Sequence, residues 1–75
     1  MMFMARIYSG AGRVQYQSPT AYPSREDAAR AALDERPNAK GVSTSRAAIV
    51  GGEWRDLHSD IRYHSRQAVE RRNLS

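Results

Sequence analysis

The segment from Arg46 to Leu57 constrains the fold most, because two short β-prone runs flank a Gly-Gly pair. A two-residue hairpin loop of the favoured twist needs positive φ values, which glycine adopts without a steric penalty. Gly51-Gly52 therefore predicts a tight turn between two strands, and the only tryptophan of the chain, Trp54, follows in the second strand. We interpret this segment as a β-hairpin.

A second hairpin is expected nearer the N-terminus. Side chains from Phe3 to Tyr8 alternate between apolar and mixed positions, which is the period of a half-buried strand. Ser9 to Gly12 interrupt this alternation, and Arg13 to Gln17 resume it. The pattern predicts a hairpin over residues 3–17.

The clearest helix signal begins at Ser24. Its hydroxyl can cap the helix, Asp27 stands three residues later, and acidic residues in the first turn suit the positive end of the helix dipole. Pro37 ends the helix, because proline cannot continue it. We predict a helix from Ser24 to Arg36, with a narrow buried face of small residues at helical spacing, namely Ala28, Ala29, Ala32 and Leu33.

The segment after Leu57 has little apolar surface. Ile61, Ala68 and Val69 form a weak seam, which predicts a loosely held helix over about residues 60–72. So little apolar surface barely offsets chain entropy, so folding on a partner and a disordered basic tail remain alternatives.

These elements predict an α+β fold, in which one helix packs on a four-stranded antiparallel sheet of ββαββ order. We expect residues 1–58 to form a single α+β domain and residues 59–75 to form a basic C-terminal helix or tail. A chain of 75 residues buries only a thin core, so a deep active site is not expected. There is no cysteine, signal peptide or membrane-length apolar run, which favours a cytoplasmic protein.

The formal net charge is +4, carried by eleven arginines and one lysine. A GC-rich genome is one explanation of this bias. The other is an anionic partner, because a guanidinium can fork onto phosphate or carboxylate whereas lysine is a point charge. The positive charge avoids residues 24–37 and gathers on the expected strands and the C-terminal segment.

No catalytic or metal motif is evident. Gly10-Ala11-Gly12 lacks the third glycine and the following helix of a dinucleotide fingerprint. His58, Asp60 and His64 lie close in sequence, but a third or fourth convincing metal ligand is missing. Because no nucleophile has an orienting base, we expect a protein that is not an enzyme and that holds no cofactor and no metal.

Aromatic and arginine side chains on the surface of a sheet can stack on bases and bind phosphates. The expected hairpins carry five such side chains, namely Arg6, Tyr8, Arg46, Trp54 and Arg55. Trp54 either lies on an open sheet face or packs inward as the largest core residue. The predicted partner-binding residues are Arg6, Arg13, Arg46, Trp54 and Arg55, followed by Arg62 and Arg66 of the C-terminal segment.

The order of elements over residues 3–57, with "YPSREDAARAAL" followed by "AAIVGGEWRDL", resembles that of small phage-encoded anti-CRISPR proteins that act on type I effector complexes. Several of these pack one helix on a bent antiparallel sheet. The resemblance implies a non-enzymatic inhibitor that binds a multisubunit Cascade complex and interferes with target DNA recruitment. Because a DNA mimic is normally acidic, an inhibitor of this charge would bind acidic protein patches, or bind near nucleic acid.

Two alternatives remain open. A small nucleic-acid-binding regulator would grip phosphates through the same arginines and through the C-terminal ones, with little sequence readout. An obligate homodimer would pair the open edges of the sheet. The C-terminal arginines of the first alternative are Arg62, Arg66, Arg71 and Arg72.

Overall fold

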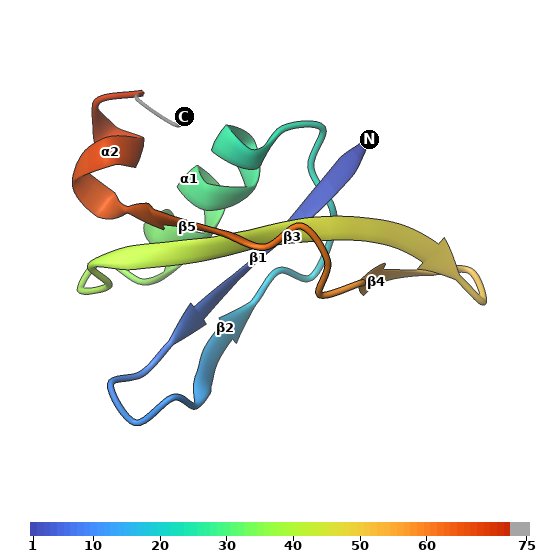
Figure 1. The fold of residues 1–75 in the computed structure, drawn as a ribbon, viewed down its shortest axis with the longest axis horizontal. Coiled ribbons are helices and arrows are strands. Elements are labelled where there is room, and N and C mark those ends of the chain that lie inside the picture. The colour runs from blue at the N-terminus through green and yellow to red at the C-terminus, as the bar shows by residue number, and fades with distance from the viewer. Residues whose placement is uncertain (73–75) are drawn as a thin grey trace.

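The computed structural model describes residues 1–72. It confirms the α+β class: a curled antiparallel sheet carries two short helices on one face (Figure 1). In the sheet, β1 (Met2–Tyr8) lies between β2 (Val14–Gln17) and β3 (Gly41–Val50). The predicted N-terminal hairpin is therefore confirmed as β1 and β2.

β3 is the longest strand, and two strands share its outer edge. Its second half pairs with β4 (Glu53–Asp56), and its first half pairs with β5 (Arg62–Ser65). The β3–β4 turn is the predicted two-residue loop, with φ of 61° at Gly51 and 84° at Gly52. Positive φ at both positions is what the favoured hairpin turn requires, which confirms the interpretation of the glycine pair.

The predicted helix is confirmed as α1 (Arg25–Glu35). The Ser24 hydroxyl accepts a hydrogen bond from the Asp27 N–H at 3.1 Å, which satisfies one of the donors left free at a helix start. All four residues of the predicted apolar face are buried against the sheet.

The core is small, because alanines supply half of its buried cluster. It comprises Ala5, Ile7, Ala28, Ala29, Ala32, Leu33, Val42 and Val69. No helix within residues 1–72 is long and apolar enough to cross a bilayer.

The helix predicted over residues 60–72 is wrong in its first half. Residues 62–65 form β5, and α2 (Arg66–Glu70) is only five residues long. The physical reason is the edge of β3, whose unpaired main-chain groups gain hydrogen bonds when this segment pairs with them. Ile61, taken as part of the helical seam, is 57% exposed, whereas Val69 alone of that seam is buried.

Candidate anion-binding site

Three arginines from three elements surround the carboxylate of Asp60. Arg25 at the start of α1 places Nη2 at 2.8 Å from Oδ2, and Arg46 of β3 places Nε at 3.5 Å from the same oxygen. Arg62 of β5 places Nε at 4.0 Å from Oδ1. The structure thus brings together two of the predicted site residues, and it adds Arg25.

Strand register explains why Arg46 and Arg62 converge. Arg62 pairs with Thr44, which lies two residues before Arg46, so both arginines project from the same face of the sheet. The main chain of the β4–β5 loop is tied to β3, because the Arg46 N–H donates to the Ser59 carbonyl at 3.1 Å. Asp60 itself has a φ of 51°, in the left-handed region that aspartate tolerates better than most residues.

Arg25 is the fixed member of the cluster. Its side chain is 12% exposed, and its guanidinium lies 4.6 Å from the centre of the Phe3 ring. Nη1 donates to the carbonyl of Thr44 at 3.2 Å and to the hydroxyl of the same residue at 3.0 Å. Burial lowers the pKa of Arg25 and Asp60 opposes this, and arginine stays protonated in proteins.

A buried histidine completes this network. The Thr44 hydroxyl lies 2.7 Å from Nε2 of His64, and burial, followed by the charges of Arg25 and Arg62, lowers the pKa of His64. The Thr44 hydroxyl accepts from Arg25 and, with one proton and two acceptor lone pairs, can bond to either tautomer of His64. His64 therefore supports Thr44. In residues 1–72 no group of three His, Cys, Asp or Glu side chains is placed to hold a metal ion.

The cluster has more positive than negative charge. Three guanidinium groups face one carboxylate, and the side chains of Arg46 and Arg62 are 46% and 54% exposed. Exposed ion pairs of this kind contribute only about 0–1 kcal/mol, so their arginines are not locked in place. Each guanidinium has five N–H donors, and Asp60 cannot occupy all of them.

Arg55 extends the positive surface along the sheet. It pairs with Ala48, two residues beyond Arg46, and therefore lies on the same face. We call Arg62, Arg46 and Arg55 the arginine row. The β3–β4 hairpin extends beyond both helices (Figure 1), which leaves Arg55 62% exposed. Measured along β3, the row steps through positions 44, 46 and 48, about 6.6 Å apart, with Arg46 on β3 itself and Arg62 and Arg55 on the two strands that share its outer edge.

A shallow cleft borders the cluster on the side of α1. Its volume is about 340 Å³, and Arg25, Arg62 and His64 contribute to its walls. The cleft therefore lies beside the one arginine of the cluster whose side chain is held in place by Thr44 and Asp60.

Other predicted residues have structural partners instead. The guanidinium of Arg66 donates to three main-chain carbonyls, at the C-terminal end of α1 and in the following loop. Arg6 lies on the opposite sheet face, bonded to Gln17 and paired with Asp56. These two arginines stabilise the fold.

Arg13 is exposed in the β1–β2 loop and Trp54 is half-buried on the open sheet face. Trp54 pairs with Ile49, on the face opposite to that of Arg55. The open-face alternative for Trp54 is therefore the one observed, and Trp54 is not the largest core residue.

Arg25 was missed because it lies in the predicted helix. A signal was present, since a cation in the first turn opposes the helix dipole and calls for an anionic partner such as Asp60. Chemically, the site offers guanidinium donors to an anion. Comparisons with family models, curated proteins and solved structures find no match for this chain.

Proposed function

We propose that this protein is a non-enzymatic nucleic-acid-binding protein that grips backbone phosphates through the arginine row and Arg25, with little readout of bases. The observation that carries the proposal is the excess of positive charge around Asp60: three arginines share a single carboxylate, and the side chains of two of them are about half exposed. The proposal places the protein in the cytoplasm of a bacterial host cell.

Phosphate is the favoured anion for two reasons. A guanidinium forks onto phosphate oxygens, and a row of cations at strand spacing suits a chain of repeated charges better than a single small ion. The net charge of +4 adds long-range attraction to a polyanion. Binding of this type depends steeply on salt, because each phosphate contact releases counterions.

Charge reversal with a matched control tests this proposal. The double variant Arg46→Glu with Arg62→Glu should lower affinity for labelled DNA or RNA oligonucleotides by about 10-fold or more at low salt, measured by fluorescence anisotropy. The control, Arg13→Glu with Arg71→Glu, changes the net charge equally at exposed positions outside the row. Equal losses in both variants would show that only net charge matters, and would refute a localised site.

A second candidate is the inhibitor of a type I effector complex. Apolar side chains lie beside the row: Val50 is 52% exposed, and Leu57, whose N–H donates to the Arg46 carbonyl at 2.9 Å, is 46% exposed. A phosphate backbone leaves such side chains in water, whereas a protein interface buries them at its centre. This surface therefore also suits an acidic protein patch.

A pull-down from a lysate that contains a type I effector complex separates the two candidates. The tagged protein is incubated with nuclease-treated and untreated lysate, and the retained components are identified. Retention of the effector complex after nuclease treatment supports the inhibitor. Retention of nucleic acid alone, lost on nuclease treatment, supports the nucleic-acid-binding protein.

A further inference from the structure

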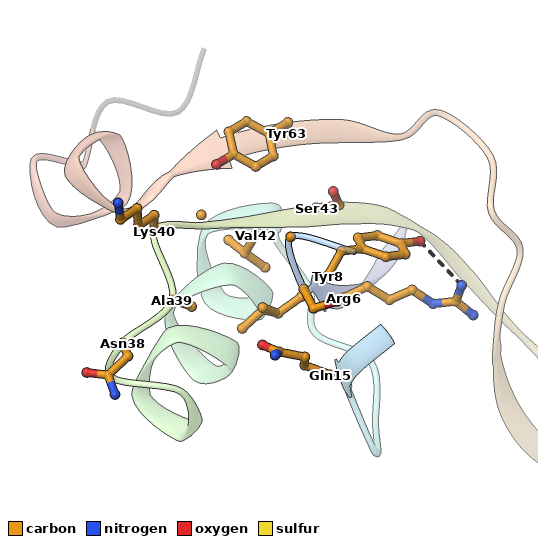
Figure 2. Close-up of a pocket in the computed structure, with 13 residues that line it drawn as sticks. Arg6, Tyr8, Gln15, Asn38, Ala39, Lys40, Val42, Ser43 and Tyr63 are labelled. Atoms are coloured by element: carbon orange, nitrogen blue, oxygen red, sulfur yellow. Dashed lines mark hydrogen bonds between the residues drawn. The ribbon is translucent and has the colours of Figure 1, made fainter. Parts of the chain in front are cut away.

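A second cleft lies where β1 and β3 separate. The pairing of these strands ends at Arg6 and Ser43, and beyond this point β1 continues towards its turn with β2. The cleft between them has a volume of about 370 Å³. Figure 2 shows the lining residues: Tyr63 lies above β3, Val42 and Tyr8 lie below this strand, and Lys40 and Asn38 lie at one end.

On the β1 side, the main chain of Tyr8 faces this cleft. Successive residues of a strand direct their N–H and C=O groups to opposite neighbours. The Ala5 carbonyl accepts from Ser18, on the β2 side of the strand, so Arg6 and Tyr8 direct their main-chain groups towards β3. Arg6 pairs with Ser43 of β3, but the β1–β3 ladder does not extend to Tyr8.

On the β3 side, the matching residue is Gly41. The Lys40 carbonyl accepts from the N–H of Arg66 at 2.7 Å, on the β5 side, so Gly41 directs its main-chain groups towards β1. In the described ladder, pairing stops at Arg6 and Ser43, two positions short of a Tyr8–Gly41 pair. The cleft therefore presents main-chain donors and acceptors from both walls.

Aromatic rings flank the opening. Tyr8 is 45% exposed and Tyr63 is 68% exposed. A Cβ at position 41 would overlap the Tyr63 ring, so Gly41 is what allows this ring to lie across the strand. By covering Gly41, the Tyr63 ring contributes to the packing of the sheet. Most of the surface of Tyr63 nevertheless remains exposed and available to a ligand.

We propose that this cleft binds one unstacked base of a single-stranded nucleic acid. The base face stacks on Tyr63 or Tyr8, and its edge meets the main-chain groups of Tyr8 and Gly41. Lys40 at the rim receives a neighbouring phosphate. This inference rests on the proposed function, which it makes specific to single strands, because a paired base cannot enter the cleft.

An extended peptide would also pair with the open main-chain groups. Two exposed aromatic rings and a cation at the rim favour a base, since every base has a face for stacking and carries donors and acceptors on its edge. A volume of about 370 Å³ is at the small end for ligand sites, which suits a single nucleotide unit.

The test compares an ordinary single-stranded DNA oligonucleotide with a fully abasic one of equal length and equal phosphate count. We expect the wild-type protein to bind the base-bearing strand about 10-fold more tightly by anisotropy, the magnitude typical of one stacked base. Equal affinities for the two strands would overturn the base site and leave the phosphate grip intact; a cleft that takes a peptide gives this result. Binding of neither strand would refute the proposed function as well.

Variants at the cleft locate the effect. Tyr63→Leu should abolish the preference for bases without changing affinity for the abasic strand, and Tyr63→Phe, which keeps the ring, should retain the preference. Gly41→Ala, which displaces the ring without removing it, should also weaken the preference, with folding checked by circular dichroism. If the preference persists in both Tyr63→Leu and Gly41→Ala, the base binds elsewhere and the proposal is wrong.

Discussion

The two faces of the sheet carry two arginine–aspartate clusters of opposite character. On the open face, the Asp56 side chain is only 4% exposed and meets one arginine, Arg6. On the helix-bearing face, Asp60 is 39% exposed and meets three arginines. The same residue types thus form a closed, neutral network in one place and an open, cationic surface in the other, so burial and the ratio of charges decide what an arginine does.

The closed network is also satisfied by neutral donors. Asp56 accepts hydrogen bonds from the Ser45 hydroxyl, from the His58 N–H at 2.9 Å and from the Gln17 amide at 3.3 Å. Burial alone would raise the pKa of Asp56, but these hydrogen bonds lower it overall. Nothing comparable surrounds Asp60, whose described partners are the guanidinium groups.

The largest expected effect is on stability at Asp56. Asp56→Asn removes the buried carboxylate that balances Arg6 and should lower the free energy of unfolding by about 2 kcal/mol, because the half-buried Arg6 guanidinium loses its charge partner and the Ser45 and His58 donors lose a charged acceptor. Urea denaturation measures this. Asp60→Asn is the matched substitution and should cost less than about 1 kcal/mol. Equal costs at the two positions would contradict the contrast between the clusters.

A smaller effect is expected on stability at acidic pH, where His64 becomes protonated. Its pKa is lowered from 6.5 in the folded protein, so the unfolded chain binds the proton more readily. Stability should therefore be unaffected by this group above that value and should fall as pH decreases from 6.5 through the folded pKa. Urea titrations across this range should show the decline, and His64→Gln should flatten it.

Asp56 should affect stability in a separate, more acidic pH range of the same titrations. Its folded pKa lies below 3.8, so its stabilising contribution is present above that value and is lost only as pH falls further. A decline that begins at pH 6.5 and persists in His64→Gln would show that another group carries it.

The smallest expected effect is on the affinity for nucleic acid. Asp60→Asn removes the one anion among three cations and should raise affinity for an oligonucleotide by about 5-fold, the size of one screened charge contact near the surface. Asp34→Asn, an equal charge change on the exposed side of α1, is the control. An affinity unchanged by Asp60→Asn, or raised equally by the control, would show that Asp60 does not compete with the ligand.

Much of the fold follows from local signals in the sequence. The capped start of α1, its alanine face and the glycine turn each depend on residues close in sequence, and each is found as predicted. β5 could not be predicted in this way. Residues 62–65 form a strand because they pair with the edge of β3, and this edge exists only in the assembled sheet.

The site follows the same division. Arg46 and Arg62 were predicted from residue type, and their meeting at Asp60 depends on a register that only the folded sheet defines. Arg6 and Arg66 carried the same signal but are occupied by partners distant in sequence. Residue type identifies the candidate cations, and long-range packing selects which remain available.

The most direct test of the central claim is the salt dependence of nucleic-acid binding, with Arg46→Gln and Arg62→Gln combined in one variant. If these arginines bind phosphates, the slope of log affinity against log salt should become shallower by about 1 for each phosphate that is no longer neutralised. The account predicts a change of about 2 in the double variant, against no change in Arg66→Gln, because Arg66 is held by main-chain carbonyls. An unchanged slope in the double variant would contradict it.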